Sequence, residues 1–373
     1  MSTLEETIRE IEQEIASTPY NKASQHHIGK LKAKLAQMRD TLIKRSSKSA
    51  GYGFAVKKSG NATVGLLGFP SVGKSTLLNV LTSAKSQIGA YEFTTLDVIP
   101  GTMEYGGVKI QILDLPGIII GASGGRGRGR EILSVVRGCD LILVLLDVFN
   151  VKHTKAILNE IYTAGIRLDE KPPKVSIKKR MMGGVHIMQT TKLKKIDHKM
   201  IKDVMNTYNI HNADIVLRED VTIDRFIDAV RGNCIYIPSV VAINKIDMVS
   251  EKKLNNLYEE YFKEYDNVPA KDILPISAES KINIDVLKDQ IFKKLDIIRV
   301  YLKPQGKSAD LEEPLIIKRG YDVGDVCDML HADFKQKFRY AKVWGKSAKF
   351  EGQVVGLGHD LEDGDILSII KDN

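Results

Sequence analysis

The sequence is short of cysteine, with three in the whole chain. Cys139, Cys234 and Cys327 are far apart, and none lies near a histidine cluster. This spacing fits neither a disulfide framework nor a zinc site. We therefore expect free thiols in a reducing compartment, which predicts a cytoplasmic protein.

The sequence also has no long apolar run. The longest candidate, residues 141–146, lies between Asp140 and Asp147 and is far shorter than the roughly 20 residues that a membrane-spanning helix needs. A run of this length is typical of a central strand in a parallel sheet. The first residues are acidic and amphipathic, without the basic and then apolar order of a secretory signal. We expect no membrane partner.

Charge is ample and unevenly distributed. The 373 residues carry a net charge of +8, with 43% hydrophobic and 27% charged residues. This composition is ordinary for a soluble globular protein, and the length predicts about two to four structural units. Basic residues concentrate in 22–48, where Asp40 is the single acid, and in 171–202. Two basic segments favour a polyanionic partner such as RNA, although a merely solvated surface is the alternative.

Four separated stretches predict one nucleotide site. They read GFPSVGKS at 68–75, DLPG at 114–117, NKID at 244–247 and SA at 277–278. The first follows an apolar run at 63–67 and precedes helical apolar spacing at 76–81. Strand, loop and helix in this order are the context of a phosphate-binding loop.

The first stretch predicts how phosphates are held. Gly68 and Gly73 permit a close backbone approach that a Cβ would hinder, so successive N–H groups can point at phosphate oxygens. Lys74 supplies positive charge at the β- and γ-phosphates, and the Ser75 hydroxyl is a predicted Mg²⁺ ligand. The predicted loop residues are Gly68, Phe69, Pro70, Ser71, Val72, Gly73, Lys74, Ser75 and Thr76.

The other stretches predict the metal and the base. Asp114 closes an apolar strand at 109–113, where a carboxylate can reach Mg²⁺ through water. Asp247 follows the strand at 239–243, and its two oxygens can accept hydrogen bonds from guanine N1–H and the exocyclic amine. Adenine offers no such pair of donors, and leaving a buried carboxylate unpaired costs about 2–5 kcal/mol. The sequence therefore predicts GTP and GDP as ligands.

Two further units flank the predicted α/β nucleotide-binding domain. Residues 1–50 are expected to form a helical hairpin, because apolar stripes at helical spacing lie on both sides of a break at 19–21. The stripes favour packing on each other over the alternative of a membrane-surface helix. Beyond 298, short strands and turns at 299–373, with a helix after Asp325, predict a compact β-grasp unit.

An insert divides the predicted nucleotide-binding domain. The segment between Asp114 and Asn244 is about 70 residues longer than a core of this type needs. We place the domain at 60–165 and 237–298, and a small α+β insert at 166–236. The insert has strand-like pieces at 175–177 and 185–188 and helical pieces around 198–208 and 222–230. His186, His198 and His211 lack metal-ligand spacing.

The combined motifs, with YEFTTL at 91–96 and a glycine-rich stretch after Gly117, resemble the Obg branch of translation-factor GTPases. The hairpin, insert and β-grasp tail narrow the resemblance to the developmentally regulated GTP-binding proteins (DRG). The resemblance covers nearly the whole chain and implies a P-loop GTPase fold, a ribosomal-protein-like insert and a TGS module at the carboxyl end. It also implies association with translating ribosomes and RNA, and a zinc-finger regulatory partner, so that the protein is a monomer or a heterodimer with this regulator.

Residue roles follow from the same resemblance. Thr95 is the expected switch residue and Mg²⁺ ligand beside Ser75 and Asp114, with Thr94 as the alternative. The Gly117 amide would contact the γ-phosphate, and Lys74, Thr95 and Gly117 are the expected catalytic set. The residues expected around guanine are Asn244, Lys245, Asp247, Ser277 and Ala278.

The chain departs from many GTPases at Ile118. Glutamine often follows the glycine of the second switch and orients the attacking water, whereas isoleucine cannot. We expect slow intrinsic hydrolysis. Some relatives compensate with K⁺, held partly by a phosphate-loop asparagine, but this chain has Ser71 at that place, so K⁺ stimulation is left open.

A glycine-rich run at 121–131 contains Arg126, Arg128 and Arg130. It is either a segment that orders against phosphate, RNA or a partner when GTP binds, or a flexible solvated loop.

The leading hypothesis is a slow GTPase that acts as a nucleotide-dependent switch on ribosomes. The alternative is a GTP-stabilised ribosome- or RNA-binding scaffold with incidental turnover. An ATP-using relative would disrupt the base motif, which is intact here.

Overall fold

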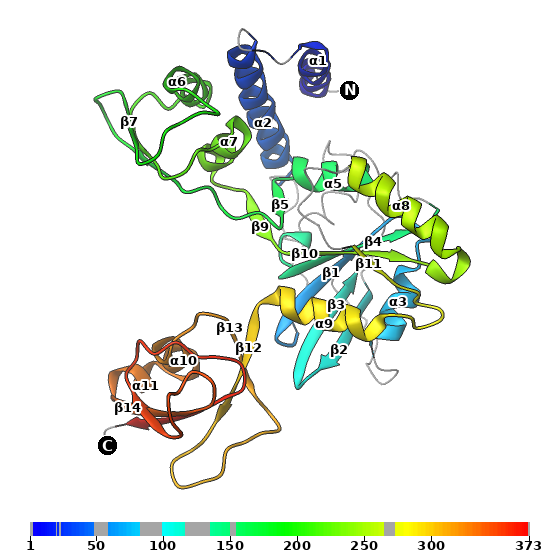
Figure 1. Cartoon of the computed structure of the whole chain (residues 1–373). Coiled ribbons are helices and arrows are strands. Elements are labelled where there is room, and N and C mark those ends of the chain that lie inside the picture. The colour runs from blue at the N-terminus through cyan, green and yellow to red at the C-terminus, as the bar shows by residue number, and fades with distance from the viewer. Residues whose placement is uncertain are drawn as a thin grey trace.

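The computed structural model describes residues 3–19, 21, 24–47, 59–82, 99–115, 135–149, 154–264 and 273–371. A central sheet domain lies between a helical hairpin with its neighbouring insert at one end and the carboxyl-terminal unit at the other (Figure 1). None of the helices in these ranges is long and apolar enough to cross a membrane.

The central sheet has six strands in the order β11-β10-β4-β1-β3-β2. Five strands run parallel and β2 pairs antiparallel with β3. The strands are β1 (Ala62–Leu67), β2 (Ile99–Tyr105), β3 (Val108–Asp114), β4 (Leu141–Asp147), β10 (Ser239–Asn244) and β11 (Ile273–Pro275). Every residue of β4 is buried, which confirms the predicted central parallel strand.

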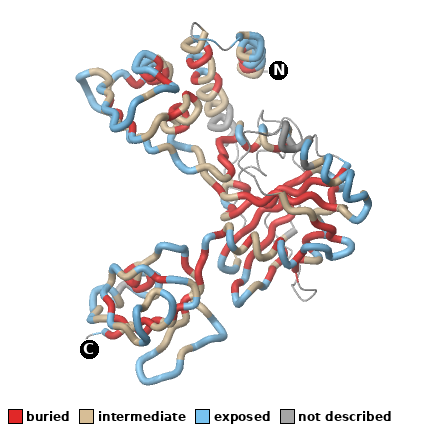
Figure 2. Tube along the Cα trace, in the orientation of Figure 1, coloured by how far each residue is buried: buried red, intermediate tan, exposed pale blue. Residues whose placement is uncertain are grey.

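Helices cover both faces of this sheet. The helices are α3 (Lys74–Leu81), α5 (Thr154–Thr163), α8 (Glu251–Glu264) and α9 (Ile284–Leu295). Leu77 of α3 and Leu287 of α9 belong to one buried cluster, whereas Ile157 of α5 belongs to the other and Leu254 of α8 packs against it. Figure 2 shows buried residues concentrated along the sheet between these layers. The predicted α/β fold class is confirmed.

The predicted hairpin forms from α1 (Thr3–Ser17) and α2 (Gln25–Ser47). Ile8 and Ile11 pack with Leu35, as the stripes predicted. The opposite charges of the helices also meet, since Arg39 donates to Glu12 at 2.6 Å.

The hairpin does more than the sequence predicted, because α2 also packs against the insert. Ala33 is fully buried in the insert's apolar cluster. Lys32 pairs with Asp224 at 2.8 Å, and Lys30 lies 3.3 Å from Asp203. Part of the basic charge of α2 is therefore matched inside the protein, which weakens the hairpin as a surface for nucleic acid.

The insert is a three-stranded sheet with two helices. Its strands β6 (Val175–Lys179), β8 (Ala213–Leu217) and β7 (Val185–Gln189) lie in that order, and its helices are α6 (His198–Thr207) and α7 (Ile223–Arg231). The two strand pieces and two helical pieces predicted there are confirmed, whereas central β8 was missed. Short strands β5 (Ile166–Leu168) and β9 (Ile235–Ile237) pair where the insert leaves and rejoins the sheet domain.

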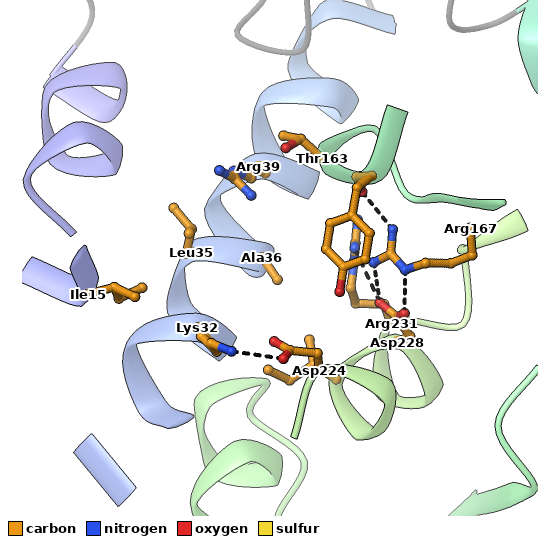
Figure 3. Close-up of a pocket in the computed structure, with 12 residues that line it drawn as sticks. Ile15, Lys32, Leu35, Ala36, Arg39, Thr163, Arg167, Asp224, Asp228 and Arg231 are labelled. Atoms are coloured by element: carbon orange, nitrogen blue, oxygen red, sulfur yellow. Dashed lines mark hydrogen bonds and ion pairs between the residues drawn. The ribbon is translucent and has the colours of Figure 1, made fainter. Parts of the chain in front are cut away.

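A pocket of about 290 Å³ lies where α2, α5 and α7 approach one another (Figure 3). Arg167 donates two hydrogen bonds to Asp228, at 2.7 and 2.6 Å, and both side chains are almost fully buried. Arg231 joins α7 to Asp40 of α2. All six charged residues lining the pocket are paired within the protein, namely Lys32, Arg39, Arg167, Asp224, Asp228 and Arg231. These ion pairs therefore connect the hairpin, the insert and the sheet domain.

The carboxyl-terminal unit has the predicted β-grasp arrangement. Its sheet order is β13-β12-β16-β14-β15, with β12 and β16 parallel in its interior. The elements are β12 (Ile297–Leu302), β13 (Leu315–Lys318), α10 (Val323–Leu330), α11 (Ala332–Gln336), β14 (Phe338–Trp344), β15 (Gln353–Val355) and β16 (Asp365–Lys371). The predicted start of its helix was wrong: α10 begins at Val323 because Asp322 and Asp325 form a capping box.

Candidate nucleotide-binding site

The loop between β1 and α3 has a backbone that needs glycine at two places. A Cβ on Gly68 would collide with the Leu145 carbonyl oxygen of β4. Gly73 has φ 96°, and a Cβ there would lie 2.5 Å from Asn244 Nδ2. Both constraints keep the loop close to the sheet, with the amino terminus of α3 directly after it, as a phosphate cradle requires.

Lys74 lies folded over this loop. Its ammonium donates to the carbonyl oxygens of Gly68 and Phe69, each at 3.1 Å. Burial lowers the pKa of Lys74 below the ordinary lysine value, an effect that nearby Asp114 partly offsets. A cation held by neutral carbonyl groups in a desolvated position gains more from a phosphate oxygen than a fully hydrated lysine would.

Ser75 and Asp114 meet at the end of β3. The Ser75 hydroxyl donates to Asp114 Oδ2 at 2.9 Å. Asp114 is buried, and its Oδ1 accepts no hydrogen bond within the described part of the chain. Burial raises the pKa of Asp114, while the Ser75 hydrogen bond and Lys74 act in the opposite direction. A hydroxyl beside an unsatisfied carboxylate oxygen is a donor set that fits Mg²⁺.

Asn244 joins three of the four predicted stretches. Its Nδ2 donates to the Val72 carbonyl at 2.9 Å, and its Oδ1 accepts from the Ala278 amide at 2.9 Å. The side chain is 3% exposed. Asn244 therefore positions the phosphate loop against the segment at 277–278. Since the Ala278 amide is engaged by Asn244, a contact from this amide to guanine stays a prediction.

Lys245 and Asp247 lie at the base side of the site. Lys245 has φ 67°, and its ammonium donates to the Ser71 carbonyl at 2.7 Å and to Asp147 Oδ2 at 3.3 Å. Asp247 is exposed in a short 3-10 helix, Ile246–Met248, and accepts no hydrogen bond from the residues that the structure describes. Its carboxylate thus has both oxygens available for a ligand.

Asp147 was missed as a site residue. The sequence marked it only as the end of an apolar run, yet it is 2% exposed and lies opposite Asn244 in the β4–β10 register. Its place at the carboxyl end of a predicted parallel strand was the signal that could have identified it.

The remaining predicted residues differ in what the structure says of them. Ser277 is fully buried and accepts from the Ser280 amide, which makes it part of a turn. Pro70 and Thr76 are exposed on the loop and on α3. Some predicted residues lie outside the described ranges, and their roles stay predictions: Thr94, Thr95, Gly117, Ile118, Arg126, Arg128 and Arg130.

Three family models match consecutive parts of the chain. A 50S ribosome-binding GTPase model matches residues 63–179, the C-terminal region of the MMR_HSR1 domain matches 182–297, and a TGS domain matches 298–371. The first two models meet inside the insert.

Full-length relatives extend this similarity. An uncharacterized GTP-binding protein of Methanocaldococcus jannaschii is 54% identical, covering 98% of this chain and 93% of its own. Developmentally-regulated G-protein 3 of Arabidopsis thaliana is 45% identical over the whole of both chains. Developmentally-regulated GTP-binding protein 1 of Xenopus laevis is 44% identical over 98% of each chain.

Proposed function

Because the chain belongs to the family of developmentally regulated GTP-binding proteins, we propose that it hydrolyses GTP slowly and acts as a nucleotide-dependent switch on ribosomes. The observation that carries the hydrolytic part is the triad of Lys74, Ser75 and Asp114, in which a desolvated ammonium lies beside a hydroxyl–carboxylate pair. This is the arrangement that stabilises charge on a transferring phosphoryl group.

Each residue of the site has a distinct part in this proposal. Lys74 neutralises the β- and γ-phosphate oxygens, and Ser75 and Asp114 hold Mg²⁺, which supplies further positive charge there. Asp247 selects guanine. Thr95 and Gly117 would report the γ-phosphate to the rest of the protein, and Ile118 leaves the attacking water without a side chain to orient it. Hydrolysis is therefore slow unless K⁺ or a partner supplies positive charge or orders the attacking water.

The ribosomal part of the proposal rests on two supports. The matching GTPase model is described as ribosome-binding, and the segment 171–202 carries exposed lysines such as Lys178, Lys194 and Lys199. In contrast to Lys32 of α2, these three have no ion pair within the described residues. We therefore assign the phosphate contacts of ribosomal RNA to the insert before the hairpin. The family's zinc-finger regulator would act on this complex in the cytoplasm.

A scaffold that binds GTP for structural reasons is the second candidate, and Ile118 favours it. Single-turnover hydrolysis separates the two. We expect the rate to rise with K⁺, ribosomes or a regulatory partner, and a rate that none of these raises would favour the scaffold. Ribosome co-sedimentation of the full chain, with GTP and with GDP, tests the switch: equal binding in both nucleotide states would contradict it.

A further inference from the structure

Asp147 is a buried acid at the carboxyl end of β4. Its Oδ1 accepts from the Phe149 amide at 3.0 Å, and its Oδ2 lies 3.3 Å from the Lys245 ammonium. A carboxylate at 2% exposure is strongly unfavourable unless donors compensate its lost hydration. These donors contribute to that compensation, and the Lys245 ammonium belongs to the base motif.

Lys245 connects this acid to the phosphate loop. The same ammonium that faces Asp147 donates to the Ser71 carbonyl at 2.7 Å. Ser71 and Lys245 both have left-handed backbones, with φ 66° and 67°, and a residue with a Cβ adopts this conformation at a cost of about 1–2 kcal/mol. The contacts of the ammonium therefore hold two strained segments in place, one on each side of the nucleotide site.

We propose that Asp147 is a positioning residue for nucleotide binding. It fixes the Lys245 ammonium, and through Lys245 it fixes Ser71, so that the base-binding segment and the phosphate loop keep one relative position. Asp147 itself does not touch the nucleotide. The inference rests on guanine-nucleotide binding at this site, and it deepens that function by adding a residue outside the four motifs.

The opposite end of the same strand offers a matched comparison. Asp140 precedes β4 and accepts from the Thr63 amide at 2.9 Å, which joins β4 to β1 far from the phosphate loop. The two acids lie at opposite ends of β4: Asp147 contacts Lys245 of the base motif, whereas Asp140 contacts Thr63 at the start of β1. Substitutions at the two positions therefore separate a general role in strand stability from a role in the site.

The test is calorimetric titration of the full chain with GDP, GTP and ATP, for the wild type and for Asp147→Ala, Asp147→Asn, Lys245→Ala and the double variant Asp147→Ala/Lys245→Ala. Asp147→Ala should weaken GDP and GTP binding by the same factor, about 10-fold to 100-fold for a lost charged hydrogen bond. The preference for guanine over adenine should remain, because Asp247 is intact. Asp147→Asn keeps an acceptor of the same shape and should lie between the wild type and Asp147→Ala.

The double variant tests whether Asp147 acts through Lys245. In the Lys245→Ala background, Asp147→Ala should weaken binding by less than about 2-fold further, since coupled residues are non-additive. Asp140→Asn should lower the melting temperature and leave the affinities unchanged. Equal factors for Asp147→Ala with and without Lys245, or wild-type affinity in a folded Asp147→Asn protein, would overturn the proposal. A wild-type protein that binds neither GDP nor GTP would instead refute the underlying function.

Discussion

The phosphate end and the base end of the nucleotide site differ in how far the protein compensates their polar and charged groups. At the phosphate end, Lys74 and Asp114 are both desolvated. Burial lowers the pKa of Lys74 and raises the pKa of Asp114, and each change favours the neutral form of the side chain. At the base end, Asn244 is held by hydrogen bonds to Val72 and Ala278, while Asp247 is exposed. The phosphate end therefore contains charges that the protein alone does not fully compensate, whereas Asn244 at the base end is already held in position.

This difference separates affinity from selectivity. The phosphate end gains free energy when a triphosphate and a cation neutralise its charges, so most of the binding strength should arise there. We expect the base end to change little on binding and mainly to reject the wrong purine. Substitutions at the two ends should therefore produce different kinds of defect.

The largest expected effect is at Lys74. Lys74 is the one basic residue of the loop 68–75 and the residue proposed to contact phosphate. Lys74→Ala should lower the affinity for GTP by about 100-fold or more, to the point where turnover is lost, because charged hydrogen bonds in desolvated sites are strong. Calorimetric titration measures this, and Lys109→Ala, at the one exposed position of the otherwise buried strand β3, is the control. Full activity in Lys74→Ala would mean that the phosphate site lies elsewhere.

A change of selectivity is expected next, at the base end. Asp247→Asn replaces one acceptor with a donor, so GTP affinity should fall by about 30-fold or more, from the loss of at least roughly 2 kcal/mol. Xanthosine triphosphate, which has a carbonyl where guanine has an amine, should bind the variant better than the wild type. Competition binding against both nucleotides checks this, with Asp285→Asn, 95% exposed on α9, as control. Unchanged selectivity would refute the assignment of Asp247.

Asp114→Asn tests the phosphate end through both nucleotide binding and the stability of the ligand-free protein. Loss of a water-mediated Mg²⁺ partner should weaken Mg²⁺-dependent GTP binding by about 10-fold to 100-fold. The ligand-free protein should melt at a higher temperature than the wild type, because a desolvated carboxylate is removed while an acceptor for Ser75 remains. A lower melting temperature, measured by calorimetry without nucleotide, would contradict the claim that this end is uncompensated.

The smallest effect is the pH dependence that Asp114 gives to stability. Its folded-state pKa lies above the ordinary aspartate value, so its favourable contribution is present below the unfolded pKa of about 3.9 and is lost as pH rises through the folded value. The stability difference between Asp114→Asn and wild type should therefore shrink as the pH falls through this range. Chemical denaturation at a series of pH values measures the trend, and a difference independent of pH would argue against it.

Much of this site follows from sequence because its motifs are local. Gly68, Lys74 and Asp114 each lie at a strand end or loop that apolar patterning identifies. The glycines of this loop indicated a close backbone approach, which the structure shows at Gly68. The central sheet followed for the same reason, since continuous apolar runs such as β4 are typical of buried parallel strands.

The features that were missed depend on partners distant in sequence. The role proposed for Asp147 depends on its contact with Lys245, and Arg167 pairs with Asp228, 61 positions away. The second packing face of α2 was hidden because Ala33 is apolar but small, so it did not stand out beside the larger residues of the first stripe. Strand β8 was missed although its pattern alternates, because charged neighbours interrupt the apolar signal.

The most direct test of the account is calorimetric titration of the purified chain with GTP and with ATP in the presence of Mg²⁺. The account predicts that GTP binds and that ATP binds at least about 100-fold more weakly, because adenine lacks the pair of donors that the Asp247 carboxylate would accept from guanine. Equal affinity for the two nucleotides, or a preference for ATP, would contradict it.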